Sequence, residues 1–258
     1  MTRRKVERIF VSVAMRRSGQ HAIHNWICRQ LDDVTYLNCC TVRRLFLRPK
    51  IEPMRGRFLV YRNGEVTDSG VQSVWRYRRS IAMTPATRHM FYSFESRDLT
   101  NPFPHYLRKN VTPTVMIIVR DPFNLFASVL RHPQLVKELD RELRLWKQHL
   151  KECLGETEYL GCPFVSVNYT RWCTDSGYRR QLSEKLGIEH SDAGRNEVLE
   201  FGGGSSFDGL NMDGQGMTMQ VQERWRELEG DERYRSVVSD PELRRLSKAY
   251  FDFLPFGD

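Results

Sequence analysis

Cysteine is sparse and scattered in this chain of 258 residues. The six cysteines include no C-x-x-C pair, and none lies at zinc-ligand spacing from other cysteines or from histidines. This distribution argues against a structural zinc site and against a disulfide framework. We therefore expect no metal centre, and we expect reduced thiols in a cytoplasmic protein.

Long apolar runs are also missing. The N-terminus is basic, but the apolar run behind it covers only residues 9–15 and ends at Arg16 and Arg17. Such a run is too short for a signal sequence or a membrane span. It predicts a buried strand, and the protein is expected to have no membrane-spanning segment.

Lysine is the scarce basic residue. Only eight of the 40 basic residues are Lys and the other 32 are Arg, in a chain with a formal net charge of +8. The planar fork of Arg suits phosphate, sulfate and carboxylate groups, so the excess fits anionic ligands; it fits an Arg-rich genome equally well. No basic stripe with interleaved aromatic side chains recurs, which argues against a nucleic-acid partner.

The Walker A pattern G-x-x-x-x-G-K-[ST] is absent, which argues against a magnesium-dependent kinase. Instead, an apolar run at residues 8–15 leads directly into Arg16, Arg17, Ser18, Gly19, Gln20 and His21. Helical spacing follows from residue 21 to about residue 31. At such a strand-to-helix turn, backbone N–H groups and the helix dipole point at one anion. We expect Gly19 to allow close approach of the backbone, Ser18 and Gln20 to donate hydrogen bonds, and Arg17 to neutralise charge. An ordinary tight turn is the alternative.

A second strand-to-helix turn follows the apolar run at residues 115–119. Arg120 stands at the strand end, Asp121 and Pro122 favour the start of a helix, and Ser128 lies about two helical turns further on. Arg120 and Ser128 can hold one phosphate from two directions. Alternatively, Arg120 pairs with a local carboxylate and Ser128 is an ordinary helix residue. Two such turns in one domain suggest a ligand with phosphates at two ends.

The remaining pattern predicts one α/β domain over residues 1–258, with a mostly parallel central sheet of four or five strands flanked by helices. Further core strands are expected at 90–94 and 164–167, and helices at 135–154, before Gly187, at 221–228 and at 241–253. An inserted β-hairpin is predicted at about 55–83, with arms at 58–61 and 74–77 and a turn signal at Asn63 and Gly64.

Together the two turns resemble the sulfotransferases that use 3′-phosphoadenosine 5′-phosphosulfate (PAPS). The match covers residues 116–128 almost without a gap. The resemblance implies that the first turn binds the 5′-phosphosulfate and that the second binds the 3′-phosphate. It also implies that residues 202–254 form a loop and helices that close over the nucleotide. The implied cofactor residues are Arg16, Arg17, Ser18, Gly19, Gln20, His21, Ala22, Arg120, Ser128, Ser205, Ser206 and Phe207.

The first turn departs from the family pattern. Many cytosolic members carry Lys-Ser-Gly-Thr-Thr at the positions where this chain has Arg17 to His21. Arg17 can still stabilise negative charge on a departing phosphate, but it is permanently protonated and cannot act as acid or base. Gln20 and His21 replace hydroxyl residues, which leaves their phosphate contacts open.

The resemblance implies an enzyme that transfers a sulfuryl group from PAPS to a hydroxyl or amine of a small molecule or glycan. Alignment, cations and a base then supply the catalysis. Glu95 is the first candidate for the base because it ends a core strand at the expected ligand edge; His21 and then His24 follow. Alternatively, Glu95 pairs with an arginine such as Arg97, and the histidines are packed or solvated. Arg17, Glu95 and His21 are thus the predicted catalytic residues.

Other functions stay open at this point. A nucleotide-dependent phosphotransferase of similar fold, a basic nucleic-acid-binding protein and a catalytically inactive nucleotide-binding relative are all compatible with the chain. Neither the acceptor, the role of the hairpin at 55–83 nor the oligomeric state follows from the sequence.

Overall fold

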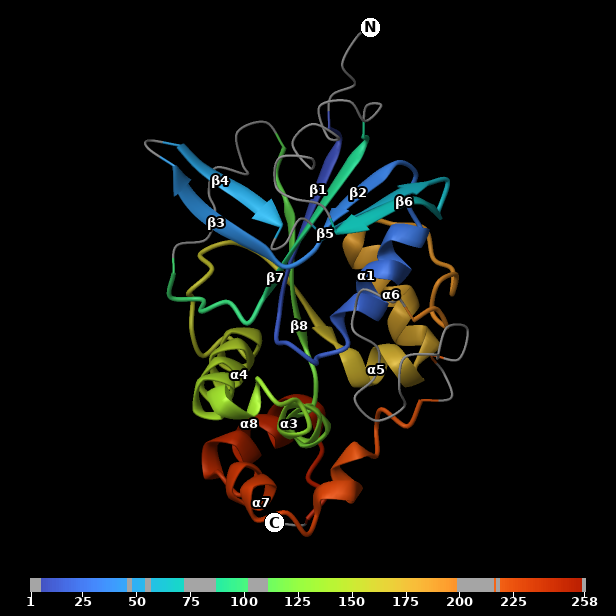
Figure 1. Cartoon of the computed structure of the whole chain (residues 1–258). Helices are drawn as coiled ribbons and strands as arrows, with labels where there is room; N and C mark the ends of the chain where they lie inside the picture. Colours follow the sequence, from blue (N-terminus) through green and yellow to red (C-terminus); the bar gives the residue numbers. More distant parts are fainter. Residues whose placement is uncertain are drawn as a thin grey trace, which may run out of the picture.

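The computed structural model describes residues 6–45, 48–53, 57–71, 87–101, 111–198, 216 and 219–256. Its centre is a seven-stranded sheet with the order β6-β5-β2-β7-β1-β8-β9 (Figure 1). The strands are β1 (Arg8–Ala14), β2 (Val34–Leu37), β5 (Arg57–Arg62), β6 (Glu65–Val71), β7 (His89–Glu95), β8 (Thr114–Val119) and β9 (Val165–Asn168). Two further strands, β3 (Cys40–Leu45) and β4 (Arg48–Pro53), form a separate antiparallel pair.

Strand β1 is the middle one of the five parallel strands, β2-β7-β1-β8-β9, as expected of a strand with apolar residues on both faces. It pairs in parallel with β7 and β8, and β2 and β9 extend the parallel core on either side. Alternate residues face opposite sides of a strand. Accordingly, Phe10 and Ala14 belong to one hydrophobic core, whereas Val11 and Val13 belong to the other.

Helices cover the two faces of the sheet (Figure 1). The first core is shared with α1 (Gln20–Arg29), α5 (Tyr169–Thr174) and α6 (Ser176–Leu186). The second core is shared with α3 (Pro122–Leu130), α4 (Leu139–Cys153), α7 (Glu232–Val238) and α8 (Pro241–Phe251). Two short 3₁₀ helices complete the described elements, η3 (Val136–Glu138) and η5 (Arg224–Leu228).

The α/β prediction is confirmed, but the strand number was too low. The prediction missed β2 because its four residues, VTYL, are too short to stand out in the sequence. It also missed β3 and β4. The domain boundaries at 1 and 258 stay a prediction.

The predicted hairpin is present, but its second arm begins earlier in the chain than predicted. Asn63 and Gly64 form the turn, both with positive φ (48° and 75°), and β6 begins at the next residue, not at residue 74. The hairpin is antiparallel to β2 and extends the central sheet at its edge. The predicted arm at 74–77 lies outside the described residues.

Two negative findings accompany the fold. No helix in the described ranges has both the length and the apolar character needed to cross a bilayer. All six cysteines fall in those ranges, and none of them forms a disulfide.

Candidate functional site

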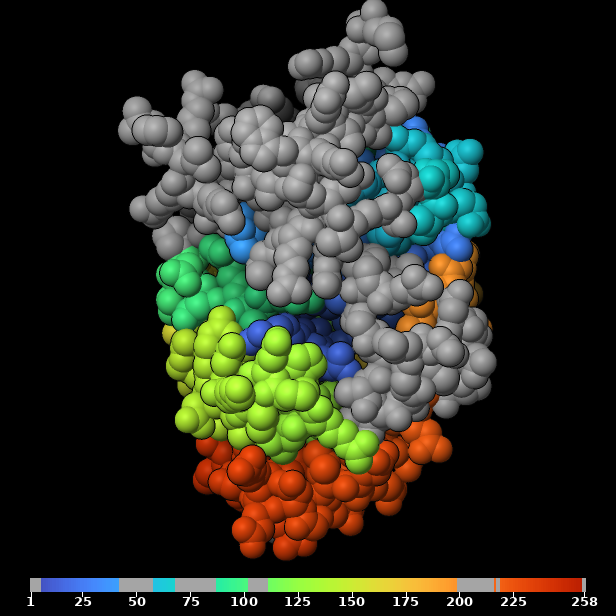
Figure 2. Space-filling model, viewed as in Figure 1, coloured from blue at the N-terminus to red at the C-terminus, as the bar shows by residue number. Residues whose placement is uncertain are grey.

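The turn after β1 lies at the carboxyl edge of the parallel strands. Ser18 donates its backbone N–H to the Met15 carbonyl at 3.2 Å, and Ala22 donates to the Gly19 carbonyl at 3.1 Å. Arg17 and Gly19 both adopt positive φ, 68° and 79°. Figure 2 shows blue atoms of the β1–α1 segment set back between the green surface of residues 87–101 and the yellow-green surface of the chain that includes α4. The turn predicted from the sequence is therefore present and recessed.

The structure gives a steric reason for glycine at position 19, and the predicted close approach of the backbone to a ligand stays a prediction. A Cβ built on Gly19 would lie 2.2 Å from the ring of Tyr169, the first residue of α5. That ring is stacked on Trp172 with centroids 6.0 Å apart. The absent side chain thus makes room for a packed aromatic ring.

Polar atoms of the turn face the same edge. The Ser18 side chain is fully buried, and its Oγ has no hydrogen-bond partner among the described residues. The Gln20 amide donates from Nε2 to Oε1 of Glu95, while its Oε1 likewise has no partner there. Buried hydroxyl and amide groups normally hydrogen-bond, so these two atoms are candidates for contacts with a ligand.

Arg17 brings positive charge to this edge. Burial lowers the pKa of its guanidinium, the nearby charge of Arg120 lowers it further, and the charge of Glu95 opposes both effects. The three charges therefore act on one another across the ends of β1, β7 and β8. A guanidinium retains its proton even so, because its pKa starts above 12.

Arg120 connects three segments. It follows β8, is 2% exposed, and donates from Nη1 to the Arg17 carbonyl at 3.1 Å and from Nη2 to the Val221 carbonyl. Its guanidinium carbon lies 5.3 Å from the centre of the Tyr169 ring. The alternative stated from the sequence was that Arg120 pairs with a local carboxylate, and no such pair is among these contacts. Arg120 joins the two predicted turns into one site.

Arg224 belongs to the same site, although sequence reasoning did not single it out. It donates from Nη1 to Ser128 Oγ at 3.1 Å, and Ser128 donates to the Asn124 carbonyl at 3.0 Å. Burial raises the pKa of the Tyr169 hydroxyl, while Arg120 and Arg224 both oppose that rise. Both guanidinium groups therefore lie near one ring. The only signal for Arg224 in the sequence was its place within residues 202–254, which the resemblance implies close over the nucleotide.

Glu95 points into the site from the end of β7. Its side chain is 17% exposed, and its Oε1 lies 3.5 Å from Nε2 of His21, whose side chain is 23% exposed. The alternative pairing with Arg97 is not what the structure shows, because the Arg97 guanidinium packs over the ring of Phe94 and donates to the Asn101 carbonyl. Glu95 and His21 are thus accessible and adjacent.

His24, the third candidate for the base, lies in the core. Its side chain is fully buried, Nε2 is 2.7 Å from Ser12 Oγ, and Nδ1 is 2.9 Å from the Tyr36 hydroxyl. Burial, with a smaller effect from His21, lowers its pKa well below the usual range. Because His24 is buried and both of its ring nitrogens have hydrogen-bond partners, it is not accessible to act as the base.

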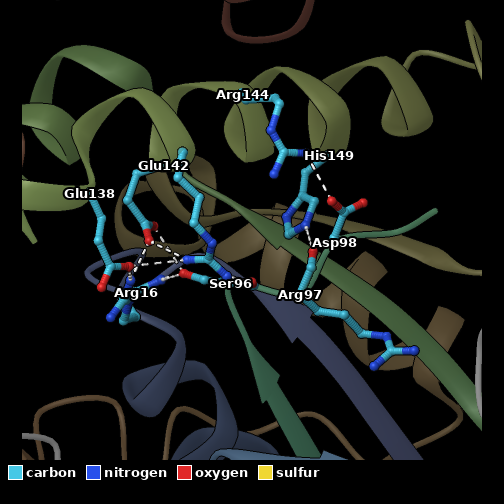
Figure 3. A network of polar contacts seen from close by, with 9 residues as sticks. Arg16, Ser96, Arg97, Asp98, Glu138, Glu142, Arg144 and His149 are labelled. Atoms are coloured by element: carbon cyan, nitrogen blue, oxygen red, sulfur yellow. Dashed lines mark hydrogen bonds and ion pairs between the residues drawn. The ribbon is translucent and has the colours of Figure 1, made fainter. Parts of the chain in front are cut away.

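The Arg16 side chain lies against two carboxylates, one in η3 and one in α4 (Figure 3). It pairs with Glu138 at 2.6 Å and with the fully buried Glu142 of α4. Glu142 also accepts from Ser96 Oγ at 2.9 Å and from Arg141 at 3.0 Å. The Arg16 backbone N–H donates to Ser96 Oγ at 3.3 Å, so this network ties the turn after β1 both to α4 and to the residue that follows β7.

A second set of contacts holds the segment after β7 against α4 (Figure 3). His149 is fully buried, and its Nε2 lies 2.8 Å from the Arg97 carbonyl. Asp98 accepts from Arg144 at 2.8 Å and from Gln148 at 2.9 Å. These contacts fix the chain that follows Glu95.

His149 should make stability depend on pH. Burial lowers its pKa to about 4, whereas an unfolded histidine titrates near 6.5. Between these values the unfolded chain binds a proton that the folded chain does not, so stability is lost as the pH falls. We expect the free energy of unfolding to decrease by about 3 kcal/mol from pH 7 to pH 4 through this residue.

Urea denaturation of His149→Gln at pH 7, 6, 5 and 4 tests this. The slope of the unfolding free energy against pH should be shallower than in the wild type, and the remaining slope should include the contribution of His24. His132→Gln, at a partly exposed position, is the control and should keep the wild-type slope. Equal slopes for wild type and His149→Gln would contradict the expectation.

Ser205, Ser206 and Phe207 lie outside the described residues, so their positions relative to the site stay a prediction. Within the part of the chain that the structure describes, no group of three or more His, Cys, Asp or Glu side chains is placed to hold a metal ion.

Comparison with known proteins identifies the fold. No family model matches the chain, and no curated protein matches it. Among solved structures, it is similar to the sulfotransferase domain of the olefin synthase from Synechococcus PCC 7002, with 12% identity, a TM-score of 0.50 and 98% of each chain covered. It is also similar to the mouse sulfotransferase SULT7A1 in complex with PAP, with 12% identity, a TM-score of 0.47, and 95% of this chain and 90% of that chain covered. The α/β domain described above therefore has the fold of a sulfotransferase domain.

Proposed function

We propose that the protein is a sulfotransferase that takes a sulfuryl group from PAPS and transfers it to a hydroxyl or amine of a small molecule or glycan. The observation that carries this proposal is the pair of basic clusters at one sheet edge. Arg17 and Ser18 form the first cluster; Arg120, Ser128 and Arg224 form the second. A donor with phosphate groups at both ends of a nucleoside matches two such clusters.

The residues present fit this donor. The buried Oγ of Ser18 and the backbone N–H groups at the start of α1 can bind the 5′-phosphosulfate, with Arg17 supplying positive charge. Ser128 Oγ is held by a contact from Arg224, and Arg120 lies at the adjacent strand end. These three side chains would hold the 3′-phosphate.

When bound, PAPS supplies a sulfuryl group that is open to in-line attack and a phosphate that leaves. Glu95 would remove the proton from the attacking hydroxyl or amine. Arg17 would stabilise the negative charge that develops on the departing phosphate, an effect that is strong at a recessed site. Gln20 orients Glu95 through its amide hydrogen bond.

Calorimetric titration tests the donor. We expect the purified protein to bind adenosine 3′,5′-bisphosphate more tightly than adenosine 5′-monophosphate or ATP with magnesium. A preference for magnesium-ATP would contradict the proposal and favour a phosphotransferase. Equal, weak binding of all three would also contradict it.

The substitution Arg120→Ala should selectively weaken the binding of adenosine 3′,5′-bisphosphate. The loss of charge-assisted hydrogen bonds to the 3′-phosphate is expected to raise the Kd by about 10- to 100-fold. The Kd for adenosine 5′-monophosphate, which lacks that phosphate, should change much less. Isothermal calorimetry with both nucleotides measures the difference.

Arg245→Ala is the matched control for Arg120→Ala. Arg245 is an exposed arginine of α8 that pairs with Glu156 at 2.7 Å and belongs to neither cluster. Its replacement removes the same charge and should leave both Kd values unchanged. Equal losses for the two nucleotides in Arg120→Ala would show that Arg120 does not recognise the 3′-phosphate.

A further inference from the structure

A series of hydrogen-bonded polar side chains leads from the core to His21, and the mechanism above does not use this series. The residue of the series that contacts His21 is Asn38, which directly follows β2 and is 1% exposed. Three groups approach its Oδ1: the Tyr36 hydroxyl at 2.9 Å, Ser93 Oγ at 3.1 Å and His21 Nε2 at 3.1 Å. One amide oxygen therefore connects the core to a residue of the site.

The directions of these hydrogen bonds are consistent along the series. Ser93 Oγ accepts from the Cys39 N–H at 2.9 Å and donates its own hydrogen to Asn38 Oδ1, because that amide oxygen can only accept. The Tyr36 hydroxyl has one hydrogen, which it donates to Asn38, and it therefore accepts from Nδ1 of His24. The second nitrogen of His24 is left to accept from the Ser12 hydroxyl at 2.7 Å.

This pattern fixes a hydrogen on His21. An amide oxygen only accepts hydrogen bonds, so a His21 ring bonded to Asn38 Oδ1 carries its hydrogen on Nε2. The same Nε2 lies 3.5 Å from Glu95 Oε1. The shorter contact is to the neutral oxygen of Asn38, and Asn38 thus competes with Glu95 for the hydrogen.

Building on the proposed function, we propose that Asn38 is a positioning residue: it keeps His21 in the Nε2–H tautomer and holds that hydrogen on a neutral oxygen, so that Glu95 remains a stronger proton acceptor. The physical reason is that a hydrogen bond donated to a carboxylate favours its ionised form and weakens it as a base. Asn38 does this without contact with either substrate.

Several charged and titratable groups surround the pair. They include His24 on α1, with its ring 6.2 Å from that of His21, Tyr36 on β2 on the other side of Asn38, and Arg17, whose charge interacts with Glu95. A test must therefore separate Asn38 from its neighbours. Ser93→Ala serves this purpose because it removes one donor to Asn38 Oδ1 and leaves the contact with His21 in place.

Nitrogen NMR of the protein without nucleotide tests the tautomer directly. With ¹⁵N-labelled histidine at pH 8, we expect His21 to show a protonated Nε2 and an unprotonated Nδ1, assigned by loss of the signals in His21→Asn. Ser93→Ala should keep this pattern, and Asn38→Leu should replace it with averaged signals. A wild-type ring with an unprotonated Nε2, or an Asn38→Leu spectrum like that of the wild type, would overturn the proposal.

Asn38→Asp keeps an acceptor for all three donors and covers the case in which Asn38→Leu does not fold. The new carboxylate should stabilise the protonated ring and shift the titration of the His21 signals upward by about 1–3 pH units. No shift would overturn the contact on which the proposal rests. These spectra require no sulfuryl transfer, so they remain decisive if the proposed function fails.

A kinetic measurement tests the consequence for Glu95. In Asn38→Leu we expect kcat to fall about 10-fold, with KM unchanged and the acid limb of the pH profile moved to lower pH. Ser93→Ala should leave the limb in place. A fall in kcat with an unmoved acid limb would reduce Asn38 to a structural role and overturn the proposal.

Discussion

Replacing Glu95 by glutamine is expected to lower kcat about 10²- to 10⁴-fold, the usual contribution of a well-placed base. The substitution keeps the shape of the side chain and its contacts with Gln20 and His21, but an amide cannot take up the acceptor proton. The Kd for adenosine 3′,5′-bisphosphate should be nearly unchanged, because Glu95 is assigned to the acceptor and not to the nucleotide. Steady-state kinetics and calorimetry on the same preparation measure both quantities.

Two further variants are needed to interpret the result for Glu95→Gln: one is a control for the loss of a charge, and the other tests the alternative base. Glu156→Gln neutralises an exposed carboxylate paired with Arg245 and should leave kcat at the wild-type value. His21→Asn removes the second candidate for the base. A large loss of kcat in His21→Asn together with no loss in Glu95→Gln would assign the base to His21 instead.

The second large effect is expected at Gly19. Gly19→Ala places a Cβ 2.2 Å from the Tyr169 ring, at a residue with φ of 79°. The ring cannot shift easily because Trp172 stacks on it and the Arg120 guanidinium lies over it. Strain at positive φ costs about 1–2 kcal/mol, and overpacking adds about 1–3 kcal/mol. We expect the free energy of unfolding to fall by the sum of the two, with loss of nucleotide binding.

Gly155→Ala separates the two causes. Gly155 has nearly the same φ, 74°, but a Cβ there would meet nothing within 4 Å. Urea denaturation should therefore show the backbone cost alone in Gly155→Ala and a clearly larger loss in Gly19→Ala. Equal losses would mean that the Tyr169 ring yields without cost and that the contact does not fix the turn.

The parallel core could be predicted because its signals are local. The run ending at Ala14 is apolar on both faces, and the helix after β8 has its cap where the sequence placed it: Asp121 accepts from the Asn124 N–H at 2.9 Å. Gly187 ends α6 in the left-handed conformation, as expected of a glycine after a helix. Each of these features depends on a few neighbouring residues.

The features that the sequence did not reveal depend on distant contacts. Arg224 enters the site because it meets Ser128, 96 positions away. Asn38 has a role only where Ser93 and His21 meet it, and no local pattern marks it. Burial separated His24 from His21, although both lie on one helix and share a residue type. Sequence patterns therefore located the turns, whereas tertiary contacts decided which side chains converge on them.

The central position of β1 also bears on how the chain is made. Ala14, which leads into the first turn, pairs with Glu95 on one side and with Ile118 on the other. During synthesis, about a hundred further residues must therefore be added after β1 before both of its neighbouring strands are present. Such late, non-local pairing slows folding, and it leaves the apolar β1 exposed and prone to aggregate until the pairing is complete. Aggregation of the nascent or refolding chain should accordingly begin with β1.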